Sequence, residues 1–428
     1  MGASVLSGPF ARRDGVLRCG EVDAGDLARR FGTPLYVYDI RRVEARARRF
    51  QRAFAGVDHL VAYSVKANGN LTILRRLGAL GCGADITSAG ELFRARKAGI
   101  PMERTVFAGV GKTAAEMREA LRAGIHSFNV ESATELRRLD RVAAELGVRA
   151  PFALRVNPDV LTVTPHEYTA TGHATTKFGV PYQEAIELYR WAAGRVNLQA
   201  RGIDMHIGSQ IVDPAPYLRA LDRVLGLARE LGAAGHHLEY VDIGGGYGIA
   251  YDDGPELDVE RLATDVTPRV REAGLRLILE PGRSVVGDAG ILLTRVEYVK
   301  RAGKTFVIVD SGMTELIRPS LYQGFHAIER VDVRQARVPE PVDVVGPICE
   351  TGDFLARDRT LDVPEEGELL AIRTVGAYGF TMASNYNGRP RPAECMVDGS
   401  EVTLIRRRET LDDLIRGEDM AEEAIPAA

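Results

Sequence analysis

The sequence predicts a closed α/β barrel followed by a mostly β domain, and three observations support this. The chain has 428 residues, more than one ordinary hydrophobic core accommodates. Between about residues 36 and 285, short apolar runs alternate with amphipathic stretches eight times, and after residue 285 the pattern changes to hairpins. Eight parallel strands in this length are typical of a TIM-like barrel, and an open doubly wound sheet is the alternative.

The expected barrel strands are apolar runs that end in polar residues or glycine. They cover 59–66, 82–87, 104–109, 125–130, 152–157, 200–208, 239–246 and 276–282. Intervening stretches such as 114–124 and 216–235 carry apolar residues at helical spacing and often end in glycine, a common helix C-cap. A further helix is expected at 41–56, ahead of the first barrel strand.

The remaining sequence reads as strands joined by turns. A hairpin is expected over 290–310 with its turn at 302–304, and further strands over 368–378 and 393–410. The first 35 residues contain short strand-like pieces, and the C-terminal tail reads as frayed. We therefore expect two domains: a barrel over 36–285, and a β domain built from 1–35 and 286–428.

Composition excludes several classes of protein. The hydrophobic share of 45% and charged share of 27% are those of a globular protein, and a net charge of -4 argues against a general nucleic-acid binder. No apolar run is long enough for a transmembrane helix, and the first residues lack the layout of a signal peptide. The four scattered cysteines and eight histidines show no metal-ligand spacing, so we expect a cytoplasmic protein without a metal site.

Chemistry in such a barrel belongs at the carboxyl ends of the strands. These ends contain a lysine, a histidine, acidic residues, arginines and glycines, but neither a Ser-His-Asp order nor an HExxH pair. The strand-end residues are Lys66, Asp85, Asn129, Arg155, Asn157, His206, Gly244–Gly246 and Glu280–Arg283.

Lys66 ends the apolar run "VAYSVK" at the predicted inner end of a strand. The chain has only six lysines among 55 basic residues, so lysine chemistry has few candidates. A buried amine suits Schiff-base chemistry, because burial favours the neutral, nucleophilic form. The alternative is a structural lysine paired with a carboxylate.

Two glycine-rich motifs suggest nucleotide or phosphate binding, and each is considered separately. "GGGYG" at 244–248 is not a dinucleotide fingerprint, because Ile249 stands where GxGxxG needs its last glycine. Its backbone amides could cradle one phosphate, or it could be only a tight turn. "GVGKT" at 109–113 resembles the end of a P-loop, but Val106 replaces the first glycine, which excludes a nucleotide triphosphatase.

Several strand-end side chains suit one cofactor when taken together. Glu280, in "EPGR", could hold a protonated ring nitrogen, and Arg283 could bind a carboxylate. His206 could present its ring face to a planar group, and Ser209 could donate to a phosphate. Each has a structural alternative, such as a buried Glu-Arg pair. Together with Lys66 they describe pyridoxal phosphate.

A family resemblance extends over nearly the whole chain. The motifs occur in order: "YSVKANGN", "GADITSAGEL", "FAGVGKT", "FNVES", "TTKFGV", "HIGSQ", "DIGGGYG", "EPGR", "IRPSLY", "CETGDFLA" and "GAYGFTMASNYNGRPRPAE". On these motifs the sequence resembles the fold type III pyridoxal-phosphate-dependent decarboxylases. The resemblance implies an alanine-racemase-like barrel, a C-terminal β domain and a carboxy-lyase activity in amino-acid biosynthesis.

The resemblance also implies roles for cofactor-binding residues. Lys66 would bind the cofactor covalently, Glu280 would keep its ring nitrogen protonated, and His206 would stack on the ring. The remaining cofactor-binding residues would be Asp85, Ser209, Gly245, Gly246, Gly282, Arg283 and Tyr378.

The implied substrate site uses residues from both domains. Arg283, Arg318 and Tyr322 would bind a distal carboxylate, Glu350 a distal ammonium, and Tyr378 both substrate and cofactor. Cys349 would donate the proton after carbon dioxide leaves. In this family Cys349, Glu350 and Tyr378 reach the barrel of a partner subunit, which implies a homodimer with shared active sites.

The residue types favour one substrate class within the family. Two arginines suit an amino acid with an additional carboxylate, which favours meso-diaminopimelate over ornithine or lysine. Another decarboxylase, of ornithine, lysine, arginine or a secondary-metabolism substrate, remains the alternative. A racemase has no use for the Cys-Glu pair, and a non-catalytic cofactor carrier would be a bare barrel. The loop over 159–180 is a candidate cover for the site.

Overall fold

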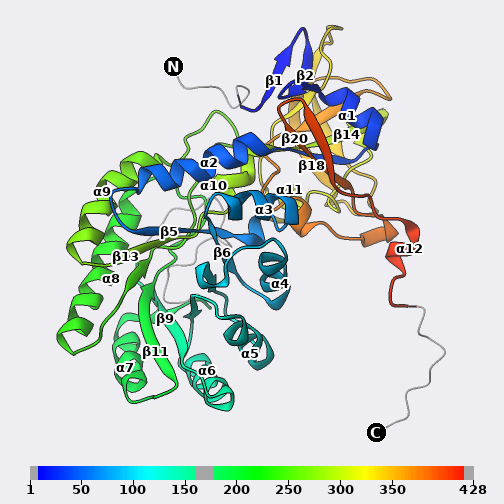
Figure 1. Cartoon of the computed structure of the whole chain (residues 1–428). Coiled ribbons are helices and arrows are strands. Elements are labelled where there is room, and N and C mark those ends of the chain that lie inside the picture. Colours follow the sequence, from blue (N-terminus) through cyan, green and yellow to red (C-terminus); the bar gives the residue numbers. More distant parts are fainter. Residues whose placement is uncertain (1–7, 161–176, 419–428) are drawn as a thin grey trace. The chain divides into compact units, whose positions relative to one another are not determined.

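Eight parallel strands close into a barrel in the computed structural model, which describes residues 8–160 and 177–418 (Figure 1). Each strand pairs in parallel with the next, and the pairing of β8 with β9 and of β13 with β5 completes the ring. The barrel prediction is therefore confirmed over the open sheet. The strands are β5 (His59–Ser64), β6 (Gly83–Ile86), β7 (Thr105–Phe107), β8 (Ser127–Val130), β9 (Ala150–Asn157), β11 (Leu198–Asp204), β12 (Tyr240–Asp242) and β13 (Arg276–Leu279).

Burial on both faces explains why these strands are apolar runs. β5 is buried at every position after His59, because its neighbours fill the barrel inside and helices cover it outside. Side chains inside the barrel form one buried cluster of Leu60, Ala62, Val106, Ala153, Tyr240 and Ile278. A packed interior leaves the carboxyl ends of the strands as the place for polar groups.

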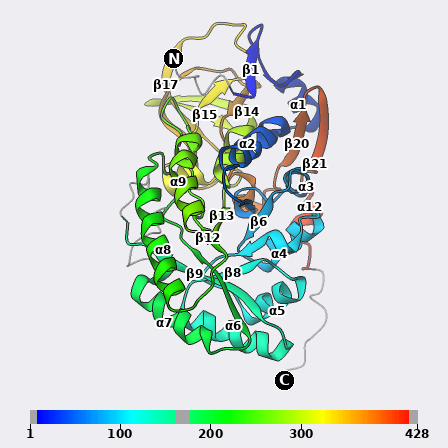
Figure 2. The same cartoon turned by 60° about the vertical axis from the view of Figure 1, so that its left-hand side comes forward.

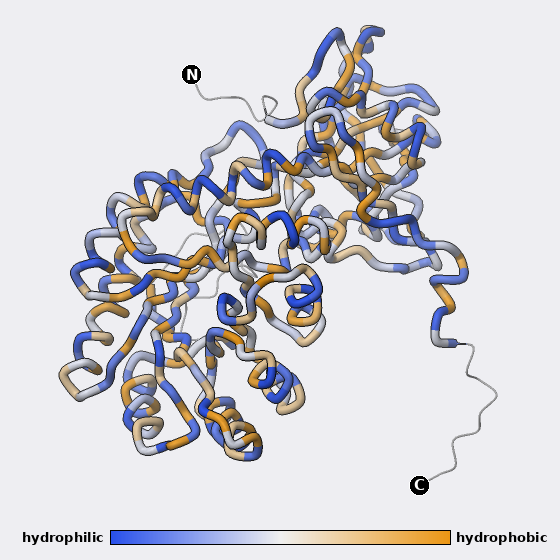
Figure 3. The backbone as a smooth tube through the Cα atoms, viewed as in Figure 1, coloured by the Kyte–Doolittle hydropathy of each residue, from blue (hydrophilic) through white to orange (hydrophobic). Residues whose placement is uncertain are grey.

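The helices of the barrel lie outside its strands, as the turned view in Figure 2 shows. Along the tube in Figure 3 these helices alternate hydrophobic and hydrophilic residues, as amphipathic helices do. Local signals set their ends: Thr113 and Glu116 form a capping box at the start of α5, and left-handed Gly124 ends it. The helices are α2 (Ile40–Ala53), α3 (Leu71–Ala79), α4 (Ala89–Lys97), α5 (Ala114–Ala123), α6 (Ala133–Leu146), α7 (Tyr182–Ala193), α8 (Ala215–Ala233), α9 (Val259–Glu272) and α10 (Arg283–Val286).

The chain divides into two compact units. The barrel unit takes Val43–Ala250 and Gly254–Gly287. The β unit takes the chain up to Arg42, the short piece Tyr251–Asp253 and the chain from Asp288 onward.

The β unit is a sheet of long strands with a smaller N-terminal sheet. Its main path runs β18-β17-β15-β14-β4-β20-β21, and the expected hairpins of β14 with β15 and of β20 with β21 are present. Its elements are β1 (Phe10–Arg13), β2 (Val16–Cys19), β3 (Val22–Asp23), α1 (Ala24–Phe31), β4 (Leu35–Asp39), β14 (Gly290–Ala302), β15 (Lys304–Val309), α11 (Arg318–Tyr322), β16 (Ile328–Arg330), β17 (Pro339–Val345), β18 (Phe354–Asp362), β19 (Leu369–Ile372), β20 (Ala393–Asp398), β21 (Glu401–Arg406) and α12 (Leu411–Leu414).

One expected strand is shorter than the sequence predicts. The apolar run over 368–378 forms β19 only as far as Ile372. Thr374 and Tyr378 then have φ angles of +58° and +57°, a left-handed conformation that ends strand pairing. The expectations for the first residues, for most of the 159–180 loop and for the last residues lie outside the described chain. Among the described residues, no helix is long and apolar enough to cross a bilayer.

Candidate active site

Lys66 lies at the carboxyl end of β5, in the one-turn helix Val65–Ala67. Its Nζ lies 2.7 Å from Oδ2 of Asp85, which belongs to the neighbouring strand β6 and is fully buried. The lysine side chain keeps 35% of its surface exposed. The carboxylate pairing expected as the structural alternative for Lys66 is therefore present, and the partly exposed side chain is compatible with the binding of a ligand.

His206 lies just beyond the carboxyl end of β11, two residues after Asp204. Burial, and then the positive charges of Arg155 and Lys66, lower the pKa of His206 well below its ordinary value. The ring is therefore neutral near pH 7 and can offer a face to an aromatic group without carrying charge.

Glu280 directly follows β13 and belongs to a buried group of acids. The carboxylates of Glu280, Asp204 and Asp242 each offer an oxygen within 4.8 Å of the others. Asn129 donates from Nδ2 to Glu280 Oε1 at 3.2 Å, and Gly244 N–H donates to Asp242 Oδ1 at 2.8 Å. These hydrogen bonds hold the carboxylates of Glu280 and Asp242 at fixed positions at the carboxyl ends of the strands.

Crowding changes the protonation of this group. Burial, and then the Asp242 carboxylate, raise the pKa of Glu280 well above its usual range, and the same two causes raise the pKa of Asp204. Burial raises the pKa of Asp242 to about 6. The group therefore retains protons at neutral pH, and a cationic ring nitrogen arriving beside Glu280 would relieve its mutual repulsion.

The glycine turn after β12 is shaped by close backbone contacts. A Cβ at Gly245 would lie 2.3 Å from the carbonyl oxygen of Glu280, and one at Gly246 would lie 2.1 Å from that of Gly208. Tyr217 donates its hydroxyl to the carbonyl of Gly245 at 2.8 Å. Only glycines fit here, which leaves backbone amides as the groups that can meet an anion.

The turn after β13 completes the same region of the barrel unit. A Cβ at Gly282 would lie 2.9 Å from the Cβ of Ser64, so the chain passes close to β5. Arg283 donates from Nη2 to Ser209 Oγ at 3.1 Å, which brings two expected phosphate ligands together. Lys66, Glu280 and these donors therefore occur on adjoining strand ends.

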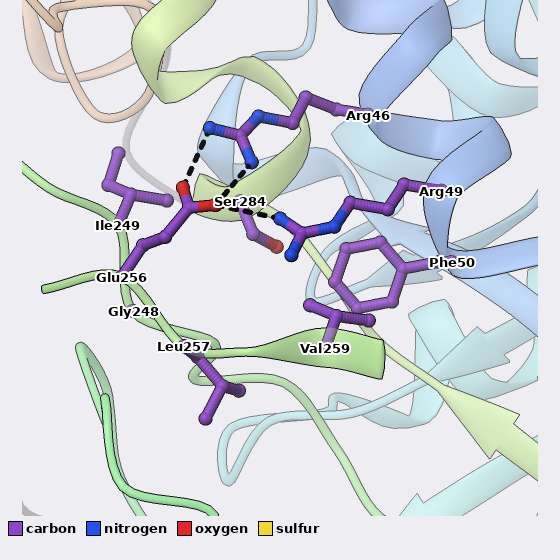
Figure 4. Close-up of a pocket in the computed structure, with 9 residues that line it drawn as sticks. All are labelled: Arg46, Arg49, Phe50, Gly248, Ile249, Glu256, Leu257, Val259 and Ser284. Atoms are coloured by element: carbon purple, nitrogen blue, oxygen red, sulfur yellow. Dashed lines mark hydrogen bonds and ion pairs between the residues drawn. The ribbon is translucent and has the colours of Figure 1, made fainter. Parts of the chain in front are cut away.

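A small pocket adjoins Gly248, the last glycine of the turn (Figure 4). The Glu256 carboxylate beside it bridges Arg46 and Arg49 of α2, each at 2.8 Å. None of the expected site residues lines this pocket. Its ion pairs fasten the segment after the glycine turn to α2, and we assign it a structural role.

The β unit holds the remaining expected residues. Cys349 is exposed, and its backbone N–H donates to Asn387 Oδ1 at 3.0 Å. Glu350 accepts from the Tyr386 hydroxyl at 2.5 Å. Arg318 and Tyr322 are the first and last residues of α11, and Tyr378 lies in the left-handed turn after β19.

The turn that presents Cys349 and Glu350 is built around one buried carboxylate. Asp353 accepts from the backbone N–H groups of Ile348 at 2.7 Å and Met313 at 2.6 Å. Cβ atoms at Gly312 or Gly346 would approach within 2.5 Å of its oxygens, so both neighbours must be glycine. These contacts fix the backbone of the turn.

Sequence reasoning missed part of the site. Asp204 and Asp242 end apolar strands and could have been found by the same strand-end rule that found Asp85. Asn129 is among the predicted strand-end residues, but the sequence predicted no role for it. Asn157, also predicted as a strand-end residue, caps the following turn through its side chain, which accepts from Asp159 N–H at 3.0 Å.

Comparison with known proteins identifies the family. Residues 40–287 match the model of the pyridoxal-binding domain of pyridoxal-dependent decarboxylases. The diaminopimelate decarboxylase of Pseudomonas aeruginosa is 50% identical over 413 residues, covering 96% of this chain and 99% of the relative. The chain belongs to the diaminopimelate decarboxylase family.

Two further relatives agree with this membership. The Neisseria meningitidis serogroup B diaminopimelate decarboxylase is 50% identical, covering 94% of this chain and 97% of the relative. The crystal structure of the Helicobacter pylori diaminopimelate decarboxylase, complexed with L-lysine, is 40% identical and has a TM-score of 0.89. It covers 93% of this chain and 99% of its own. The family resemblance, the carboxy-lyase class and pyridoxal phosphate as cofactor are thereby confirmed.

The residues of the barrel unit fit this cofactor. Arg283 and Ser209 supply neighbouring donors that suit a phosphate, beside glycine turns where any side chain would clash with the surrounding backbone. Oδ1 of Asp85 and Oδ1 of Asn129 are buried polar atoms without a hydrogen-bond partner, so the mouth retains polar capacity for a ligand. Lys66 supplies the amine that a pyridoxal aldehyde requires.

Proposed function

We propose that this chain decarboxylates meso-2,6-diaminopimelate to L-lysine and carbon dioxide, the last step of lysine biosynthesis. The observation that carries this is the set of strand ends in the barrel unit, where Lys66, Glu280 and the glycine turns adjoin. These residues occur in a chain that is 50% identical in sequence to two diaminopimelate decarboxylases over 94–96% of its length. The H. pylori relative binds L-lysine, the product expected here.

The barrel residues would bind and orient the cofactor. Lys66 would hold it covalently after release from Asp85, Glu280 would hold a proton at its ring nitrogen, and neutral His206 would stack on the ring. Bound pyridoxal phosphate supplies an electron sink for the electron pair left when carbon dioxide departs. Ser209, Gly245, Gly246, Gly282 and Arg283 would fix its phosphate.

The substrate would be recognised at the end that does not react. Arg283, Arg318 and Tyr322 would bind the distal carboxylate, because guanidinium groups match carboxylates in geometry and charge. Glu350 would bind the distal ammonium, Tyr378 would contact both substrate and cofactor, and Cys349 would deliver a proton to the reacting carbon.

We further propose a homodimer in which the β domain of one subunit serves the barrel of the other. In this proposal residues 36–285 form the cofactor-binding domain, and 1–35 with 286–428 form the β domain. The exposed positions of Cys349 and Tyr386 support it, since both are available to a partner. A cytoplasmic location agrees with the scattered cysteines, which are all free.

Carbon dioxide release from a panel of amino acids tests the substrate proposal. We expect turnover of meso-diaminopimelate and little or none of lysine, ornithine and arginine, because only diaminopimelate retains a distal carboxylate after losing one. The purified protein, saturated with pyridoxal phosphate, would be assayed against each amino acid at equal concentration. A clear preference for ornithine or lysine would overturn the proposal in favour of a related decarboxylase.

A further inference from the structure

Arg318 is enclosed within the β unit by two aromatic side chains. Only 8% of the residue is exposed, although arginine is seldom buried without partners. Its guanidinium carbon lies 4.5 Å from the ring centroid of Tyr251, and its Nη1 lies 2.6 Å from Nε2 of His326. The ring of Tyr251 stands edge-on to His326, with centroids 5.3 Å apart at 86°.

The direction of hydrogen bonding defines the state of His326. A guanidinium can only donate, so Nε2 must accept from Arg318. The backbone carbonyl of Arg373, 2.8 Å from Nδ1, can only accept, so Nδ1 must carry the hydrogen. His326 is therefore neutral, in its Nδ1–H tautomer, and it has no exposed surface.

Three arginines form hydrogen bonds with His326 through their side chains or backbone. Besides Arg318 from α11, Arg359 from β18 donates from Nη1 to the His326 carbonyl at 2.9 Å. Arg373, which follows β19, turns its own side chain to Glu329 and to the Phe10 carbonyl. Protonation of His326 would remove the acceptor for Arg318 and place two cations in contact.

We propose that His326 is a positioning residue for recognition of the substrate's distal carboxylate. Its neutral ring takes one of the five N–H groups of Arg318, and Tyr251 covers a face of the guanidinium. The guanidinium is thereby fixed in one orientation before substrate arrives, which lowers the entropic cost of a two-point carboxylate contact. The inference rests on the proposed function, since it assumes that Arg318 binds this carboxylate.

Two substitutions separate positioning from packing. His326→Leu keeps a buried side chain of similar size without an acceptor, whereas His326→Gln retains an acceptor at its outer end. In the holoenzyme we expect the leucine variant to raise KM for diaminopimelate, and the inhibition constant of L-lysine, about tenfold. The glutamine variant should restore most of the affinity.

A ligand without a carboxylate gives the matched measurement. Cadaverine has the two amines of lysine but no carboxylate, so its inhibition constant should be the same in the wild type and in His326→Leu. His126→Leu, which replaces another buried histidine in the barrel unit, is the control and should leave all three constants unchanged. Cofactor content and thermal midpoint identify any variant that fails to fold.

The pH profile supplies a readout that packing alone would not move. In the wild type KM should rise as pH falls and His326 gains a proton, whereas in His326→Gln this part of the profile should be absent. Equal KM values in wild type and His326→Leu, or equal weakening of cadaverine and lysine, would overturn the positioning role. Failure of the wild type to release carbon dioxide from diaminopimelate would instead overturn the proposed function.

Discussion

Asp204, Asp242 and Glu280 place three acids together where the barrel offers little solvent. Each is at most 3% exposed. Burial raises the pKa of all three, because ionised carboxylates are disfavoured away from water and beside one another. In the folded chain these acids hold protons that the unfolded chain has already released.

This arrangement predicts how stability depends on pH. For the aspartates, whose pKa is about 3.8 in the unfolded chain, the stabilising contribution is fully present below that value, and for Asp242 it is lost as pH rises through about 6. In the cofactor-free protein, the thermal midpoint should fall as pH rises from about 3.8 to about 6. The Asp204→Asn substitution should reduce this fall by a few degrees relative to the cofactor-free wild type. Thermal unfolding followed by circular dichroism across this range measures the difference.

A surface acid provides the control. Asp222 on α8 keeps 60% of its side chain exposed, and Asp222→Asn should retain the wild-type pH dependence. The same slope in Asp204→Asn as in the wild type would show that the three carboxylates do not share protons.

At the scale of an element, the turn after β12 depends on backbone approach. It passes so close to Glu280 and Gly208 that side-chain atoms have no room. Two of its glycines, Gly244 and Gly246, also have φ angles of +68° and +91°, which other residues rarely adopt.

Gly245→Ala should therefore weaken cofactor binding, because its Cβ would push the turn away from Glu280. We expect at least a tenfold loss of pyridoxal phosphate affinity and a cost of about 1–3 kcal/mol in unfolding free energy, as for other overpacked sites. Fluorescence titration of the apoprotein measures the affinity. Gly232→Ala in α8, where a Cβ meets nothing within 4 Å, should leave affinity intact; an unchanged affinity in Gly245→Ala would contradict the cradle assignment.

The sequence was most informative where local patterns decide structure. All eight barrel strands lie within their predicted ranges or within two residues of them, because buried parallel strands are apolar runs with abrupt polar ends. β17 is not among the predicted strands, and it contains Pro339 and Pro341, residues that seldom occur inside a sheet. Both prolines lie where β17 pairs only with β18, and its pairing with β15 begins at Val342.

The parts of the site that sequence could not reveal depend on distant neighbours. The pairing of Lys66 with Asp85 follows from adjacent strands and was open to inference. The hydrogen bond from Arg318 to His326 could not be foreseen, because the seven residues between them include the irregular turn at Gln323, whose φ is +51°.

At the scale of the whole molecule, the proposed dimer predicts complementation between inactive variants. Lys66→Ala removes the barrel lysine and Cys349→Ala the proton donor of the β unit. If the two belong to different subunits at each site, a mixed dimer has one intact site. Random subunit exchange should then restore about a quarter of wild-type activity.

The measurement is carbon dioxide release after co-refolding the two variants in equal amounts. A mixture of Lys66→Ala with Glu280→Ala serves as the control, because both changes lie in the barrel unit and no subunit combination yields an intact site. No recovery in the first mixture, although each variant dimerises, would argue that each site uses residues of one subunit only.

The turn built around Asp353 has a consequence for how this protein can change over evolution. The Asp353 carboxylate lies between two glycines and accepts hydrogen bonds from the backbone of the turn. Insertions or deletions there would break these hydrogen bonds and disrupt the turn. Substitution of Glu350 leaves those contacts untouched. New specificity at this position is therefore accessible through single changes of side-chain length and charge, one point mutation at a time, on an inherited backbone.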